Sequence, residues 1–242
     1  MISKSNSKNY NNKKRRKWTY IIVAICFIML LIFAYSHIGI YTEKMKMEHY
    51  LNERYGKNFK VSNVRRVGSG IGVEGVIFAD AELKDGSVEK FMIRRWGKTR
   101  YLDEYPNTVY NDRERLELDK IIRGLSVKPS RYLVDININP EIYDKVRDMP
   151  KLIDLLKDYG KEVDYGVKVI VQGNSPTRDN INDVKKLASY TALKNPKNSS
   201  VRYVINSKDG TYRYVCQHYN ENTDVSSIQI DEKCFTRSGG VE

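Results

Sequence analysis

The pattern of apolar and polar residues divides the chain into three consecutive parts. Residues 18–41 carry no charge, and their centre, 21–34, is wholly apolar. A helix of this length spans about 36 Å, which exceeds the ~30 Å hydrocarbon core of a bilayer. A polar segment, 1–17, precedes this run, and a longer segment of mixed polarity follows it. The pattern therefore predicts a disordered tail over 1–17, a transmembrane helix over 18–41 and a folded region beyond.

The segment directly after the apolar run has a helical period. Met47, Tyr50, Leu51 and Tyr55 recur on one face of a 3.6-residue repeat, and Gly56 follows as a stop signal. The spacing predicts a helical stalk over 42–56 that continues the apolar helix.

Beyond the stalk, short β-branched and aromatic runs lie between turn residues. They predict strands at 59–67, 73–83, 88–96, 132–138, 167–171, 201–205, 212–219 and 227–230. Asp85-Gly86 and Asp209-Gly210 are typical of hairpin turns. Apolar positions at helical spacing predict helices at 110–124, 152–159 and 180–193. Meanders mixed with helices indicate an α+β fold with antiparallel sheet, not a doubly wound parallel sheet.

The predicted α+β domain covers 57–237, with a loose end over 238–242. It forms either one body or two small lobes that divide near 126–130. One short repeat bears on this choice, because Leu51-x3-Tyr55-Gly56-Lys57 has the same spacing as Leu155-x3-Tyr159-Gly160-Lys161. The repeat is explained either by a duplication of about 100 residues or by two ordinary glycine-capped helices.

Positive charge is concentrated at the N-terminus. The chain has a net charge of +12, and seven Lys or Arg residues with no acid precede the apolar run. From Thr42 onward the net charge is only +5, with both signs interspersed, which argues against a nucleic-acid partner. The asymmetry predicts a cytoplasmic N-terminus and an extracytoplasmic domain in the cell membrane. Aromatic residues mark the two predicted membrane interfaces: Trp18, Tyr20, Tyr35 and Tyr41.

Two other readings of the apolar run remain open. In one, it is a signal peptide cleaved after the small-x-small sequence Ala34-Tyr35-Ser36, although apolar residues continue to Ile40. In the other, Cys26 is a lipidated cysteine, although Ile25 stands where a small residue is expected.

Cysteine and histidine are scarce. Cys216 and Cys234 lie in the part expected on the oxidising side, so we expect a disulfide between them. A zinc site built on these two residues and His218 is the weaker alternative, because its spacing is unlike that of common zinc motifs. We assign no metal ligand and no cofactor.

The sequence offers no catalytic constellation. Gly68, Gly70 and Gly72 form a glycine run, but the predicted strand after it does not suit a phosphate-binding loop. No nucleophile motif lies near a histidine. The chain has 30 acids, so carboxylate pairs arise by chance and none is singled out.

Tyrosine is abundant, at 18 residues. Tyr203, Tyr212 and Tyr214 fall in the second predicted hairpin. Tyrosine is enriched at interfaces, so these three are predicted to form an exposed partner-binding patch. The alternative is that tyrosine simply favours strands.

The Lys/Asn/Ile/Tyr-rich composition, basic tail and single anchor resemble those of membrane-anchored exported proteins of low-GC Gram-positive bacteria. The resemblance concerns organisation and the segment around Tyr55-Gly56-Lys57, Phe59 and Val61. The tether, the lack of a catalytic constellation and the tyrosine-rich hairpin together predict a binding or accessory module with a protein partner at the outer membrane face. Such a module serves an envelope, secretion or conjugation complex, or acts as an immunity protein against an exported toxin. The alternative is a membrane-anchored envelope hydrolase that uses carboxylates.

Overall fold

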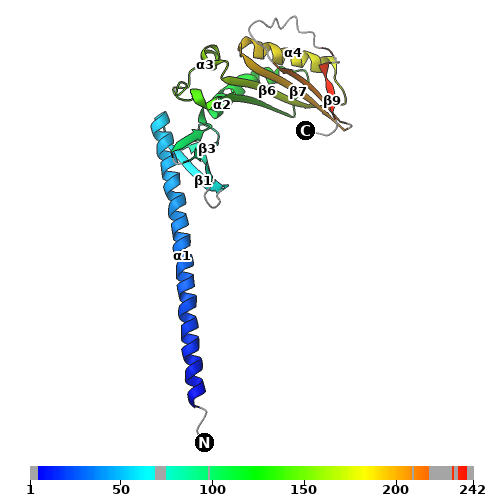
Figure 1. Ribbon diagram of the computed structural model, residues 1–242. Helices are drawn as coiled ribbons and strands as arrows, with labels where there is room; N and C mark the ends of the chain where they lie inside the picture. The colour runs from blue at the N-terminus through cyan, green and yellow to red at the C-terminus, as the bar shows by residue number, and fades with distance from the viewer. Residues whose placement is uncertain are drawn as a thin grey trace.

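The computed structural model describes residues 5–68, 75–97, 99–208, 210–217, 231 and 234–238. A long helix, α1 (Ser5–Tyr55), leads into two β-sheets, and several helices accompany the second sheet (Figure 1). The predicted α+β class with antiparallel strands and several helices is therefore confirmed.

Helix α1 runs without a break from the basic tail through the apolar run into the predicted stalk. The apolar side chains along its middle are exposed: Ile22, Val23, Ile25, Phe27, Ile28, Met29, Leu30 and Leu31. Within the part of the chain that the structure describes, no helix is both long and apolar enough to cross a membrane.

The first sheet is an antiparallel meander in the order β1-β2-β3-β4. Its strands are β1 (Phe59–Val67), β2 (Val76–Leu83), β3 (Phe91–Trp96) and β4 (Arg100–Asp103). Met47 and Leu51 of α1 are completely buried against this sheet, as the stalk period predicts. We call the last turns of α1, these four strands and the start of α2 the first lobe.

The second sheet has the order β5-β6-β7-β8-β9. Its strands are β5 (Arg131–Ile138), β6 (Val163–Gln172), β7 (Asn198–Ser207), β8 (Gly210–Gln217) and β9 (Thr236–Ser238). All neighbours pair antiparallel except β6 and β7, which are parallel. The parallel pair requires a crossover, and α4 (Arg178–Leu193) supplies it across one face of the sheet (Figure 1). We call this sheet and its helices the second lobe.

The remaining helices lie between the two sheets in sequence. They are α2 (Tyr105–Arg123), the short 3₁₀ helix η1 (Pro140–Ile142) and α3 (Leu152–Tyr159). Helix α2 belongs to both hydrophobic cores, because Tyr105 and Val109 pack in the first and Tyr110 and Leu118 in the second. The predicted lobe boundary near 126–130 falls in the connection between α2 and β5. The buried residues of α2 thus contribute to the cores of both lobes.

The repeated Leu-x3-Tyr-Gly-Lys segments end their helices differently. Gly56 has a φ of +63° and its N–H donates to the Asn52 carbonyl, so it closes α1 in the left-handed conformation. Gly160 has a φ of −61°, within the right-handed region. The strand after the first segment lies at a sheet edge, whereas the strand after the second is internal. These differences favour two ordinary helix ends over a duplication.

Two predicted boundaries around residue 100 are wrong. The segment between the predicted strand 88–96 and the predicted helix 110–124 contains β4, which pairs with β3 after a turn at Gly97, where φ is +64°. Helix α2 begins at Tyr105 and not at 110, because Pro106 sits in its first turn, where the missing N–H costs nothing. The strand predicted at 227–230 lies outside the described residues.

Candidate functional site at the end of the long helix

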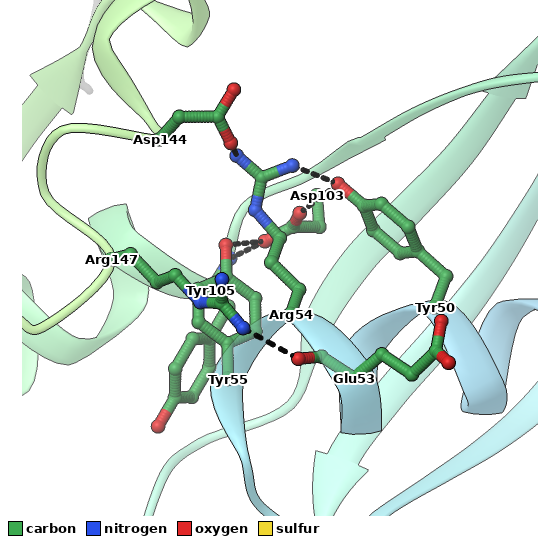
Figure 2. Close-up of polar contacts among 8 residues, drawn as sticks. All are labelled: Tyr50, Glu53, Arg54, Tyr55, Asp103, Tyr105, Asp144 and Arg147. Carbon is green, nitrogen blue, oxygen red and sulfur yellow. Dashed lines mark hydrogen bonds and ion pairs between the residues drawn. The ribbon is translucent and has the colours of Figure 1, made fainter.

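The end of α1 meets both lobes through a group of polar side chains, which we call the stalk junction (Figure 2). Its members come from α1, from the β4–α2 corner and from the segment after η1: Tyr50, Arg54, Tyr55, Asp103, Tyr105, Asp144 and Arg147. The helical period places Tyr50 and Tyr55 beside the buried Met47 and Leu51. The junction is therefore a direct consequence of how α1 packs.

Asp103 is the centre of the stalk junction. It is the last residue of β4 and is 1% exposed. One carboxylate oxygen accepts a hydrogen bond from the Tyr55 hydroxyl at 2.8 Å and another from the Tyr105 backbone N–H at 3.2 Å. The other oxygen accepts from the Tyr50 hydroxyl at 3.1 Å. Two phenols of α1 are thereby bound to the end of the first sheet (Figure 2).

Burial dominates the electrostatics of Asp103. It raises the pKa of the carboxyl above its ordinary value, and the hydrogen bond from Tyr55 and the charge of Arg54 oppose that rise. Burial also raises the pKa values of Tyr50 and Tyr55, and the Asp103 charge adds to both shifts. Both phenols therefore stay neutral near pH 7 and act as hydrogen-bond donors to the carboxylate.

Arg54 connects this cluster to the second lobe. Its guanidinium donates to the Tyr50 hydroxyl at 2.6 Å and forms an ion pair with Asp144. The same group lies over the rings of Tyr50 and Tyr55, 5.5 and 5.7 Å from their centroids. Arg147 adds a second link, because it donates to the Glu53 carbonyl at 2.6 Å. These contacts fix the direction in which α1 leaves the domain.

A second buried carboxylate lies within the second lobe. Glu114 of α2 is 3% exposed and accepts hydrogen bonds from the hydroxyls of Tyr165, at 2.8 Å, and Tyr190. Lys194 lies 3.2 Å from its other oxygen and completes an ion pair. Glu114 thus joins α2, β6 and the end of α4 inside the second lobe.

The two carboxylate clusters hold neighbouring helices and strands together. Asp103 and Glu114 are both enclosed, and their oxygens are held by phenols, a backbone amide or a lysine. Within the residues that the structure describes, no three His, Cys, Asp or Glu side chains lie together as a metal site. The stalk junction can hold a helix at a fixed angle, and that is the function its geometry supports.

The predicted partner-binding patch on the second hairpin is wrong. Tyr203 is completely buried and Tyr214 is 5% exposed, while Tyr212 is partly buried against the same core. Tyr203 and Tyr214 are opposite each other on β7 and β8, on the inward face of the sheet, and Phe235 packs on both rings. Burial raises the pKa of Tyr203 to about 12, and its hydroxyl accepts from the Asn180 amide at 3.1 Å. The preference of tyrosine for strands, and not an interface, explains these residues.

The other predicted site residues are described only in part. Tyr20 and Tyr41 are exposed on α1, at 73% and 63%. The side chains of Trp18 and Tyr35 lie outside the described residues. Cys234 is exposed, and the side chain of Cys216 lies outside the described residues, so their disulfide stays a prediction.

Sequence reasoning did not identify the stalk junction. It grouped Tyr50 and Tyr55 on one helix face, but the partner Asp103 is 53 residues from Tyr50. The available signal is the Tyr50–Arg54 pair, which has the i, i+4 spacing of neighbours on a helix.

Comparison with known proteins gives little further information. No family model matches the chain, and no curated protein is similar to it. The crystal structure of a DUF5037 family protein from Ruminococcus gnavus ATCC 29149 is similar over 68% of this chain and 75% of that chain. Its identity is 14% and its TM-score is 0.43. A likeness of this size assigns neither a family nor a function.

Proposed function

We propose that this chain is a membrane-tethered module whose α+β domain is held at the outer face of the cell membrane to bind a protein partner. The partner belongs to an envelope, secretion or conjugation complex, or is an exported toxin that the module neutralises. The residues 18–41 serve as the single-pass anchor, with the N-terminus in the cytoplasm.

The observation that carries the proposal is the continuity of α1. The uncharged run and the buried end of the stalk belong to one helix, whose apolar middle is exposed and whose last turns pack on the first lobe and contact the second. Exposed apolar side chains over many turns are unfavourable in water, and a lipid environment removes that cost. A rigid connection then sets how the domain faces its partner.

The stalk junction supports a binding role over a reaction. Its buried carboxylate holds α1 in place, and Arg54 and Arg147 hold the second lobe to the same helix. A partner that meets the domain therefore meets a surface in a defined orientation. Pre-organisation of this kind lowers the entropic cost of binding.

The anchor and its direction are tested by extraction and by a reporter. Full-length protein is expected to stay with membranes in alkaline carbonate, and a reporter fused after Glu242 is expected to be active only outside the cytoplasm. Leu30→Arg places a charge in the centre of the apolar run and is expected to weaken insertion. Leu193→Arg, at an exposed leucine of the second lobe, is the matched control. Release of the unaltered protein by carbonate would refute the anchor.

The binding role is tested by crosslinking full-length protein in its native membrane and identifying what is captured. One dominant protein partner supports the proposed role and names the complex. Capture of no protein, together with activity of the purified protein on envelope extracts, would instead favour the envelope hydrolase.

A further inference from the structure

A groove of about 590 Å³ lies between α1 and the first sheet, at the outer end of the uncharged run. From the helix, Ile38, Gly39, Ile40, Thr42 and Glu43 line it, and from β1 and β2, Val64, Arg65, Arg66 and Ile77. Its walls are largely apolar, and the two arginines are exposed. A groove of this composition suits a molecule with an apolar part and a negative charge.

The position of the groove follows from the direction of β1. The strand leaves the end of α1 and runs back beside it, as Figure 1 shows. Its nine residues span about 30 Å, whereas α1 covers about 26 Å between Ile38 and Tyr55. The far end of β1 therefore reaches the part of α1 where the uncharged run ends. Under the proposed anchoring this is the level of the lipid headgroups.

The same end of the first sheet carries exposed cationic and apolar side chains. Strand pairing brings Val67 beside Val76, Ile77 beside Arg95, and Trp96 beside Arg100, so one sheet end gathers all of these. Trp96 is 61% exposed and Val67 is 54% exposed. We call the exposed residues of this end the membrane-proximal rim: Arg65, Arg66, Val67, Trp96 and Arg100.

The charges of the rim are available for an anion. No described residue forms an ion pair with Arg65, Arg66 or Arg100. The carboxylate in the groove, Glu43, is already paired with Arg95 at 2.6 Å and with Lys46 at 3.4 Å. Exposed arginines next to a tryptophan form the combination that favours a membrane interface.

We propose that the membrane-proximal rim and its groove bind an anionic phospholipid of the outer leaflet. Arg65 and Arg66 contact the headgroup phosphate, Trp96 lies among the headgroups, and the apolar walls of the groove accept the start of an acyl chain. The inference rests on the proposed anchoring of α1. It adds a second contact with the membrane, which holds the first lobe down against the surface.

The test uses tryptophan fluorescence in reconstituted full-length protein. Trp18→Phe leaves Trp96 as the sole tryptophan. The protein is placed in phosphatidylcholine vesicles with or without phosphatidylglycerol, together with a lipid that carries a nitroxide quencher on its headgroup. Quenching of Trp96 is expected, and it is expected to be stronger with phosphatidylglycerol and weaker in high salt.

Arg65→Gln with Arg66→Gln is the decisive variant. Each arginine near an anionic surface favours the contact by about fivefold, so the double variant is expected to lose most of the phosphatidylglycerol-dependent quenching. Arg131→Gln with Arg202→Gln removes the same charge from exposed positions of the second lobe and is expected to quench like the unaltered protein.

The outcomes separate the two proposals. Protein that resists carbonate extraction but shows no quenching of Trp96 overturns the lipid site and leaves the anchor intact. Equal quenching in the two arginine variants, or in both kinds of vesicle, overturns recognition of the anionic headgroup. Protein that carbonate extracts from the vesicles overturns the anchor, and the lipid site with it.

Discussion

Asp103 and Glu114, two of the buried carboxylates among the described residues, have similar surroundings but different ways of compensating charge. Asp103 and Glu114 each accept hydrogen bonds from two tyrosine hydroxyls. Glu114 also has a direct cation, since Lys194 lies 3.2 Å away. Asp103 accepts its third hydrogen bond from a backbone N–H. Arg54 donates to the hydroxyl of Tyr50, which in turn donates to Asp103.

The difference reflects what each carboxylate joins. Glu114 lies within the second lobe, and its charge is neutralised there. Asp103 lies where α1 meets the first sheet, and neutral donors hold it in place. Burial raises the pKa of the Asp103 carboxyl, and the hydrogen bond from Tyr55 and the charge of Arg54 only oppose that rise, so this carboxyl responds to pH. The Glu114 cluster therefore stabilises the interior of the second lobe. The stalk junction holds α1 at its angle to the first sheet, and it remains sensitive to the protonation of Asp103.

Removing the ion-paired carboxylate is expected to have the largest effect. Glu114→Ala leaves Lys194 without its partner and two phenols without an acceptor, so the free energy of unfolding is expected to fall by about 3 kcal/mol. Hydrogen–deuterium exchange is expected to increase in β6 and α4. Glu117→Ala, at a half-exposed glutamate on the same helix, is the control and is expected to change stability by less than about 0.5 kcal/mol. Equal effects would mean that Glu114 contributes little.

Removing the junction carboxylate is expected to have a smaller and more local effect. Asp103→Asn retains one acceptor oxygen for three donors, so a loss of about 2 kcal/mol is expected. Exchange is expected to increase first at the end of α1, with the second sheet little changed. Asp158→Asn, at an exposed position of α3, is the control. A uniform increase over both lobes would contradict a local joint.

The pH dependence of stability is expected to differ between the unaltered protein and Asp103→Asn. The folded-state pKa of Asp103 lies above its ordinary 3.8, so the folded state binds the proton more tightly than the unfolded state does. As pH falls from neutral through that raised pKa toward 3.8, the Asp103 contribution to stability is expected to increase, and it is lost again as pH rises. The advantage of the unaltered protein over Asp103→Asn is therefore expected to widen on acidification. Denaturant titrations of both proteins check this, and parallel pH profiles would contradict it.

Removing the ion pair between Arg54 of α1 and Asp144 of the second lobe is expected to change stability least. Asp144 is 88% exposed, so its pairing with Arg54 is screened by water. A double-mutant cycle with Arg54→Ala and Asp144→Ala is expected to give a coupling energy below about 1 kcal/mol. Arg54→Ala alone is expected to cost more than Asp144→Ala, because Arg54 also contacts Tyr50 and lies over two rings. Equal single effects would contradict that order.

Local patterns account for much of the secondary structure. The limits of β1 and α3 match their predictions, because each has a clear period and a glycine or turn signal at its end. The stalk face was also predicted, since Met47 and Leu51 are buried and Tyr50 and Tyr55 lie beside them. β4 was missed because a four-residue strand has too few positions to show alternation.

Long-range contacts account for what the sequence did not show. The tyrosines of the second hairpin were expected at the surface, but strand register turned Tyr203 and Tyr214 inward under Phe235. Asp103 had no feature that distinguished it from 29 other acids until α1 folded against the first sheet. The burial of Asp103 depends on packing between segments about 50 residues apart.

The unbroken course of α1 has a geometric consequence for the whole molecule. Each residue of an α-helix turns the chain by about 100° and advances it by about 1.5 Å. Under the proposed anchoring, the number of residues between the bilayer and the stalk junction sets the rotational orientation of the second lobe about the helix axis, as well as its distance from the membrane. One inserted residue would rotate the domain about the helix axis by more than a quarter turn. Seven inserted residues would nearly restore its orientation and move it about 10 Å farther from the membrane. The length of the helix thus determines both the rotational orientation of the domain about the helix axis and its distance from the membrane.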